Sequence, residues 1–146
     1  MHTSSAARSR AHSDGAVRPR TSPRVIILAL LLDILCVVIF VMIGRRNHEA
    51  GVFTLGTLNA VWPFATGLIV GWVAVRAWRF PTRVVSPGIP VWIATIVVGM
   101  LLRVVSDQGV QLSFVIVGAL FTALFLLGWR SIWSVIGLLA SRKNRS

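Results

Sequence analysis

A long apolar run interrupted by a single acid places the strongest constraint on how this chain can fold. Residues 25–43 read VIILALLLDILCVVIFVMI, in which Asp33 is the one charged residue. About 20 apolar residues, rising about 1.5 Å each, cross a hydrocarbon core of about 30 Å, so the run predicts a membrane-spanning helix. An ionisable group inside such a helix costs roughly 2.5–3.5 kcal/mol on insertion scales. Asp33 is therefore expected to have a partner in the fold or a functional role.

The composition extends this prediction to the whole chain. Hydrophobic residues make up 55% of the 146 residues and charged residues 13%, whereas soluble domains carry roughly 25% charged residues. The charges are confined to the tails and to short joints between apolar runs. The sequence therefore predicts an all-α fold, an integral membrane four-helix bundle. The lone Cys36 excludes an internal disulfide and a cysteine-based metal site, and we expect it to pack as a small apolar residue.

Four spans separated by polar joints give the expected domain organisation. Residues 1–24 lack apolar periodicity and predict a disordered basic cytoplasmic tail, whereas residues 133–146 predict an apolar and then basic cytoplasmic tail. The stretch Ser131–Ser141 is too short to span again. We expect it to lie along the membrane interface, with a prolonged last helix as the alternative. The expected four-span domain covers residues 25–132, with spans at about 25–43, 55–75, 89–105 and 110–129.

The basic residues predict the orientation of the spans. Of the 15 Lys and Arg residues, only Arg45, Arg46 and Arg103 fall on one side of the predicted spans, and the others fall on the side of both termini. Because positively charged loops stay in the cytoplasm, both termini are expected to be cytoplasmic, in a multi-pass protein of the cell membrane. All tryptophans except Trp62 fall near the cytoplasmic ends of the spans, where indoles commonly anchor helices. This topology accounts for the net charge of +11, so the lipid bilayer, and not nucleic acid, is the expected partner.

Asp33 and Arg103 are the two ionisable residues expected within the bilayer. At about 1.5 Å per residue, Asp33 lies about 12 Å from the start of its span and Arg103 about 21 Å from the start of the third, and the long Arg side chain covers most of the difference. The structural interpretation is an ion pair that fixes how the first and third spans pack. The functional interpretation is a protonatable site that moves protons or cations. We expect the ion pair, and the sequence leaves the charge of Asp33 open.

The remaining polar residues indicate no chemistry. Arg45, Arg46 and His48 crowd the end of the first span, where we expect them to anchor the helix at the membrane surface, with an anion or a lipid headgroup as the alternative. The three histidines form no metal constellation, and the sequence lacks tyrosine, paired carboxylates and a Gly-rich phosphate loop. We therefore predict no enzymatic activity, no cofactor, no metal and no identifiable soluble substrate.

The second span carries the clearest helix-packing signals. Gly67 and Gly71 form a small-xxx-small pair, which lets two helices approach closely, and we expect this pair to support a homodimer. Pro63 follows Trp62 about one turn into the span and is expected to kink or open the helix there.

A weak internal repeat links the second and fourth spans. The pair Gly71-Trp72 recurs as Gly128-Trp129, and each pair is followed by an Arg and a further Trp. Two tandem hairpins would produce such a repeat. A match of so few residues also arises by chance, and chance is the interpretation that we adopt.

Several short anchors occur in a fixed order along the chain. They are D-x-x-C-V-V-I-F from Asp33, G-R-R-N-H from Gly44, W-P-F from Trp62, Gly71-Trp72, G-M-L-L-R from Gly99, Ser113-Phe114 and L-G-W-R from Leu127. In this order they resemble an uncharacterised prokaryotic membrane family, catalogued as domain of unknown function 3054. The resemblance covers roughly residues 25–132 and implies four spans with no assigned activity.

Two classes of function remain open. The first is a non-enzymatic membrane protein of unknown biochemical function that acts through association within the membrane, as a subunit or scaffold. The second is a small proton-coupled or cation transporter that works as an oligomer, with Asp33 as the intramembrane site. A transport acid should be open to water and free of a salt bridge, whereas a structural acid should be paired. The surroundings of Asp33 therefore discriminate between the two classes.

Overall fold

The described part of the chain folds into helices and short helical turns. The computed structural model describes residues 21–44 and 55–143. Within these ranges every regular element is helical, as the composition predicts. The elements are α1 (Pro23–Gly44), α2 (Leu55–Ala74), the 3₁₀ turn η1 (Ala77–Arg79), the π-type turn η2 (Val84–Gly88), α3 (Ile89–Val105) and α4 (Leu112–Lys143).

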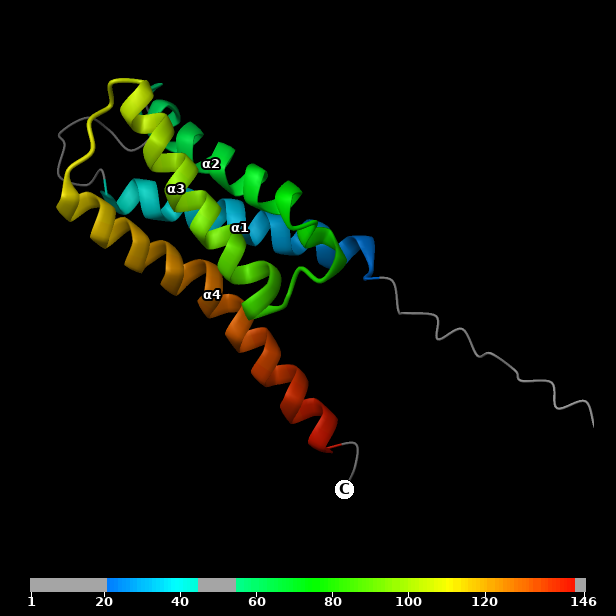
Figure 1. Ribbon diagram of the computed structural model, residues 1–146. Helices are drawn as coiled ribbons and strands as arrows, with labels where there is room; N and C mark the ends of the chain where they lie inside the picture. Colours follow the sequence, from blue (N-terminus) through cyan, green and yellow to red (C-terminus); the bar gives the residue numbers. More distant parts are fainter. Residues whose placement is uncertain (1–20, 45–54, 144–146) are drawn as a thin grey trace, which may run out of the picture.

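The four long helices pack side by side, and successive helices run in opposite directions (Figure 1). Each is long and apolar enough to cross a membrane, when η2 is counted with α3. We call the end of the bundle that holds Gly44, Leu55, Val105 and Leu112 the pocket end. The opposite end, which holds η1 and η2, is called the η end. There Thr21 donates a hydrogen bond of 2.9 Å to the carbonyl oxygen of Arg79, which ties the start of α1 to η1.

Helices α2 and α3 make the closest backbone approach, because glycines on α2 face the backbone of α3. A Cβ built on Gly67 would lie 2.8 Å from the carbonyl oxygen of Thr95, and one built on Gly71 would lie 3.0 Å from the Cα of Val91. The small-xxx-small pair is therefore a packing surface, as predicted, but it is used within the chain. Both glycines are buried, so they offer no contact to a second copy.

A second set of contacts places phenylalanine rings against glycines of neighbouring helices. The ring of Phe64 on α2 occupies the space beside Gly99 on α3, where an added Cβ would lie 2.6 Å from the ring. The ring of Phe40 on α1 lies against Gly118 on α4, at 3.0 Å from such a Cβ. The two rings also meet edge to face, with centroids 5.2 Å apart. Aromatic rings often pack edge to face. Because the two rings also contact α3 and α4, the pair joins all four helices in one core.

Two prolines lie inside the predicted spans. Pro63 is buried within α2, which the structure shows as one α-helix from Leu55 to Ala74. Nearby, the hydroxyl of Thr66 donates a 2.8 Å hydrogen bond to the carbonyl of Trp62. Pro90 lies in the first turn of α3, where its missing N–H has no partner to lose.

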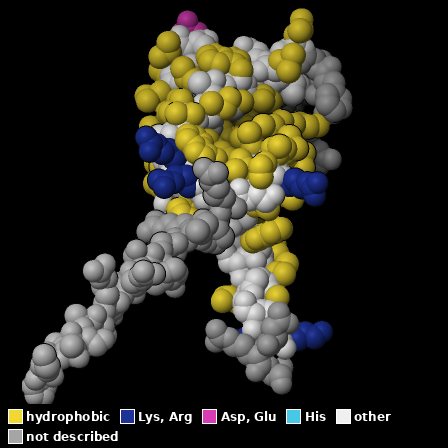
Figure 2. Space-filling model, turned by 90° about the vertical axis from the view of Figure 1, so that its right-hand side faces the viewer, with side chains coloured by type: hydrophobic (Ala, Val, Ile, Leu, Met, Phe, Trp, Pro, Cys, Tyr) yellow, Lys and Arg dark blue, Asp and Glu magenta, His cyan; other side chains and the backbone are white. Residues whose placement is uncertain are grey.

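Apolar side chains cover the outside of the bundle. Figure 2 shows hydrophobic atoms over most of the visible face, with Lys and Arg gathered in a band near the η end and again at the tip of α4. This pattern is inverted with respect to a soluble protein, whose surface carries its charges throughout. Exposed apolar residues on the four helices include Leu31, Ile69, Val97, Leu101, Leu120 and Leu124. The exposed bases of the η end are Arg24, Arg76, Arg79 and Arg83.

Helix α4 continues far beyond the predicted end of the fourth span. It runs for 32 residues to Lys143, and its C-terminal part projects away from the other helices (Figure 1). The stretch Ser131–Ser141 therefore prolongs the helix, the alternative that the sequence had left open. Every residue from 131 to 143 is exposed. At about 1.5 Å per residue the helix is about 48 Å long, which exceeds a hydrocarbon core of about 30 Å.

Candidate functional site: a buried carboxylate between the first and last helices

Asp33 lies in the middle of α1 and is completely buried, with 0% of its surface exposed. Its neighbours Ala29, Cys36 and Val37 on α1 belong to the apolar core. A carboxylate in such surroundings must be compensated by hydrogen bonds and by an opposite charge, because isolated burial of a charge is very costly. The chain supplies both.

The opposite charge is Arg130, on the last helix. Its Nη1 donates to Oδ1 of Asp33 over 2.7 Å, and its Nη2 donates to Oδ2 over 2.6 Å. Both side chains are completely buried. Two parallel N–H···O bonds between a guanidinium and a carboxylate combine charge with a fixed relative orientation, the strongest form of this pairing. The ion pair therefore fixes α1 against α4.

Two tryptophans complete the shell around the acid. The indole Nε1 of Trp72 on α2 donates to Oδ2 over 2.8 Å, and that of Trp129 on α4 donates to Oδ1 over 2.9 Å. A carboxylate has about four lone-pair sites, so two indoles and two guanidinium bonds use all of them. Asp33 therefore has no remaining site for a metal ion, a water molecule or a ligand.

Arg130 is held as firmly as the acid that it faces. Its Nε donates to the carbonyl of Pro81 over 3.1 Å, and Nη1 also donates to the carbonyl of Leu126 over 2.7 Å. The guanidinium carbon lies 4.5 Å from the ring centroid of Trp129. Gly88 in η2 leaves room for the side chain, because a Cβ there would lie 3.1 Å from Cδ of Arg130. The connection between α2 and α3 thus encloses the site from the η end.

The prediction of an ion pair between Asp33 and Arg103 is wrong. Arg103 lies at the pocket end, where it donates to the side-chain and main-chain oxygens of Gln108 and to the carbonyl of Gly109. The depths of backbone positions pointed to Arg103, whereas Arg130 stands just beyond the predicted end of the fourth span. The Arg130 side chain instead lies back over Leu126, toward the N-terminus of its own helix, as long helical side chains do. That direction carries the guanidinium into the bundle.

The tryptophans also differ from their expected role as interface anchors. Trp72 and Trp129 bind Asp33, and Trp92 donates to the carbonyl of Ala119 over 3.0 Å and to the hydroxyl of Thr122 over 3.2 Å. These three indoles therefore join helices inside the bundle. Trp62, in contrast, is exposed and donates only locally, to Asn59 over 3.3 Å.

The weak repeat is the signal that could have found the site. Its two copies, Gly71-Trp72 and Gly128-Trp129, contain the two indoles that bind the two oxygens of Asp33. The residue after the second copy is Arg130 itself. The repeat therefore contains the two indole donors to Asp33. The interpretation of the repeat as a chance match overlooked them.

The other predicted polar site residues stand at the end of the first span. Arg45, Arg46 and His48 lie outside the described residues. Among residues 21–44 and 55–143 no group of three or more His, Cys, Asp or Glu side chains could hold a metal ion.

The fold and the site together define a class of protein. It is a bundle of four helices, each long and apolar enough to cross a bilayer, in which a buried ion pair joins the first helix to the last. The chain belongs to a family described as "Protein of unknown function (DUF3054)", whose model matches residues 30–133. All four residues of the Asp33 site lie in the matched range. No significant match to a curated protein or to a solved structure was found.

Proposed function

We propose that this chain is a multi-pass protein of the cell membrane, with both termini in the cytoplasm, and that it acts without enzymatic activity through association within the bilayer. The Asp33 site carries this proposal. A transported proton or cation must reach its acid from water on each side in turn, whereas this carboxylate is 0% exposed and has four hydrogen-bond donors. The site favours a structural acid over the alternative of a transport site.

The band of exposed bases supports the proposed orientation. Arg24, Arg76, Arg79 and Arg83 lie at the η end, the same end from which α4 projects toward its basic tip (Figure 2). Positive charge on one side of a set of spans favours the cytoplasm for that side. Because Arg130 is buried, it no longer counts as a loop charge. The remaining basic residues still lie mostly on the side of the η end.

Association within the bilayer fits the distribution of exposed apolar residues over the helices. The described residues form no separate soluble domain, so a contact that they make uses the helices or their ends. The spans expose Leu31, Ile69 and Leu120, and the part of α4 that projects beyond the η end exposes Ile132 and Ile136 and packs against no other described helix. We propose that a second copy of the chain forms the contact, in a homodimer.

Carbodiimide reactivity tests the role of Asp33. Dicyclohexylcarbodiimide modifies protonated carboxylic acids that are reachable from the membrane, so a transport acid should react and be found as an adduct by peptide mass spectrometry. We expect no adduct at Asp33 in the wild-type protein. In Arg130→Gln the acid loses its counter-charge and two of its four hydrogen-bond donors, and should react. An adduct in the folded wild-type protein would favour the transport alternative.

Mass measurement tests the association. We expect a dimer in mild detergent and in nanodiscs, by native mass spectrometry. Replacement of Ile132, Ile136 and Leu139 by Ser should shift the population toward monomer. The same change at Leu120 and Leu124, which are exposed on the part of α4 within the bundle, controls for the effect of adding polar residues to the bundle. A wild-type monomer in both environments would refute the homodimer, and would leave the result for Asp33 unaffected.

A further inference from the structure

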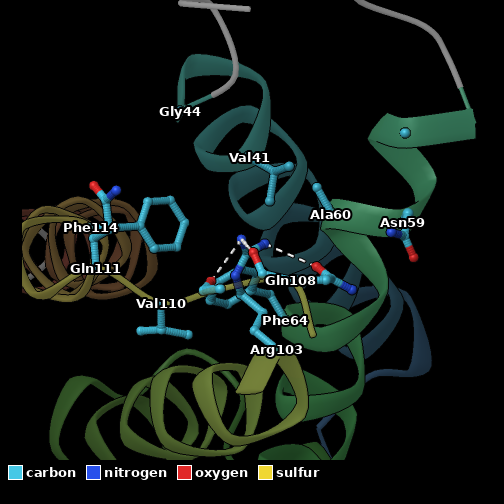
Figure 3. A pocket seen from close by; sticks show the side chains of 12 residues that line it. Val41, Gly44, Asn59, Ala60, Phe64, Arg103, Gln108, Val110, Gln111 and Phe114 are labelled. Atoms are coloured by element: carbon cyan, nitrogen blue, oxygen red, sulfur yellow. Dashed lines mark hydrogen bonds between the residues drawn. The ribbon is translucent and has the colours of Figure 1, made fainter. Parts of the chain in front are cut away.

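A pocket of about 690 Å³ opens at the pocket end of the bundle, far along the helices from the Asp33 site. It is lined by residues of α1, α2, α3, α4 and the loop between α3 and α4 (Figure 3). Its walls are apolar at Val41, Ala60, Phe64 and Phe114. Among the described residues of its lining, Arg103 is the one that carries a charge. The volume falls within the range of roughly 300–1,000 Å³ that is typical of ligand pockets.

The charge of Arg103 is fixed in place by neutral groups. Its Nη1 donates to Oε1 of Gln108 over 3.1 Å, and its Nη2 donates to the carbonyls of Gln108 and Gly109 over 3.3 and 3.4 Å. The guanidinium carbon lies 4.9 Å from the ring centroid of Phe114. None of these partners carries a formal negative charge, so among the described residues the positive charge is oriented but not neutralised.

Two buried donors beside this charge lack an acceptor. Among the described residues, Nε of Arg103 and Nε2 of Gln108 are buried and make no hydrogen bond. A buried donor without a partner costs roughly 1–3 kcal/mol, and native proteins contain few of them. Here both belong to a pair of hydrogen-bonded side chains that lines the pocket (Figure 3). An oxygen that carries negative charge is a suitable acceptor for such donors and for the guanidinium.

We propose that this Arg103 pocket binds an anionic phosphate group, presented either by a lipid headgroup or by a free phosphate. The pocket lies at the end of four helices of membrane-spanning length, the level at which lipid phosphates lie. Guanidinium groups bind phosphate oxygens well, and the apolar walls suit the glycerol and upper acyl carbons of a lipid. Asp107, in the same loop, is exposed and does not line the pocket.

Native mass spectrometry of the full chain in detergent tests the lipid source. The probes are dioleoylphosphatidylglycerol and dioleoylglycerol, which differ by the phosphate-bearing headgroup. We expect the wild-type protein to retain the phosphatidylglycerol at least tenfold better than the diacylglycerol. Arg103→Gln should reduce that retention about tenfold, and Gln108→Leu, which keeps the charge, should reduce it several-fold. Arg83→Gln removes an exposed base at the η end and should leave retention unchanged.

Inorganic phosphate tests the free source. A rise in thermal unfolding temperature with phosphate but not with chloride, lost in Arg103→Gln and kept in Arg83→Gln, would identify a free phosphate as the ligand. Stabilisation by phosphatidylglycerol alone, with the same dependence on Arg103, would identify the lipid. Equal behaviour of Arg103→Gln and Arg83→Gln with both probes would overturn the proposal.

A further control concerns the chain's own acid, Glu49, which lies outside the described residues. Phosphate binding that appears only in Glu49→Gln would show that an internal carboxylate is the natural partner of Arg103, and would also overturn the proposal. If Arg103→Gln fails to give a folded protein, Gln108→Leu provides the decision, because it removes an unpartnered donor and keeps the guanidinium. Unchanged retention in a folded Gln108→Leu would then contradict the site.

Discussion

Asp33 and Arg130, separated by 97 positions in the chain, meet through two hydrogen bonds of 2.6 and 2.7 Å in a site that excludes solvent. The pair joins the first helix to the last, and indoles from α2 and α4 close its sides. A buried pair of this kind contributes modestly to stability when intact, but loss of one partner is expensive. The arrangement therefore makes clear predictions for variants.

Removal of either charge should destabilise the bundle strongly. Asp33→Asn leaves a buried guanidinium without its anion and Arg130→Gln leaves a buried carboxylate without its cation, and each change should cost about 3–5 kcal/mol. The double variant should recover part of the loss, because neither charge remains unpaired. The measurement is the unfolding free energy in detergent by denaturant titration.

Arg103→Gln provides the control for that cycle. Arg103 shares no hydrogen-bond partner with Asp33, so its effect should add to that of Asp33→Asn within about 0.5 kcal/mol. Coupling between Asp33 and Arg103 as large as that between Asp33 and Arg130 would contradict the geometry of the site.

The two indole donors should each contribute measurably. Trp72→Phe and Trp129→Phe retain most of the ring but remove one N–H from the charged acceptor, and a hydrogen bond to a charged group is worth about 1.5–3 kcal/mol. Each variant should unfold at a lower temperature in detergent. Trp78→Phe, on the exposed surface of η1, is the matched control and should leave the unfolding temperature unchanged. An equal loss in all three variants would mean that the bonds to Asp33 contribute nothing specific.

The glycines of α2 should not tolerate a methyl group. Gly67→Ala places a Cβ 2.8 Å from the Thr95 carbonyl, and the resulting overpacking should cost about 1–3 kcal/mol. Gly137→Ala on the exposed part of α4 meets nothing within 4 Å, and should be neutral or stabilise the helix by up to about 1 kcal/mol. Unfolding free energies of the two variants provide the comparison. A destabilised Gly137→Ala, or a neutral Gly67→Ala, would contradict the packing of α2 on α3.

Cysteine accessibility should reveal the orientation. In a Cys36→Ser background, single cysteines at Ser5, Thr82 and Asn144 should react from the cytoplasmic side, and one at Asn47 from the opposite side. The measurement is labelling of intact cells by a membrane-impermeant maleimide, with lysed cells as the reference. Ser5 and Asn144 labelled from opposite sides would refute an even number of spans.

The sequence predicted the helices well because the signals for them are local. Apolar runs of sufficient length predicted all four, and the third span matches α3 at Ile89 and Val105. A buried, partnered Asp33 followed from the cost of a charge in an apolar run. Its partner did not follow, because the choice between Arg103 and Arg130 depends on helix packing and on the direction of a side chain. Neither property is encoded in the spacing along the chain.

The Arg103 pocket was equally beyond local reasoning. Its walls come from every long helix, and its unpartnered donors depend on the loop that brings Gln108 onto Arg103. The sequence also could not show that Gly67 and Gly71 pack against α3. A small-xxx-small pair has the same sequence pattern whether it contacts another helix of the chain or a second copy.

The separation of Asp33 and Arg130 along the chain also has a consequence for biosynthesis. Synthesis of the 97 positions between them, at about 5–20 residues per second, takes roughly 5–20 s. Throughout that interval the nascent first helix carries an acid whose counter-charge has not been made. A chain that stops before α4 keeps an acid without its counter-charge and retains only one of its two indole donors, that of Trp72. The burial of the first helix with its acid therefore depends on completion of the last helix.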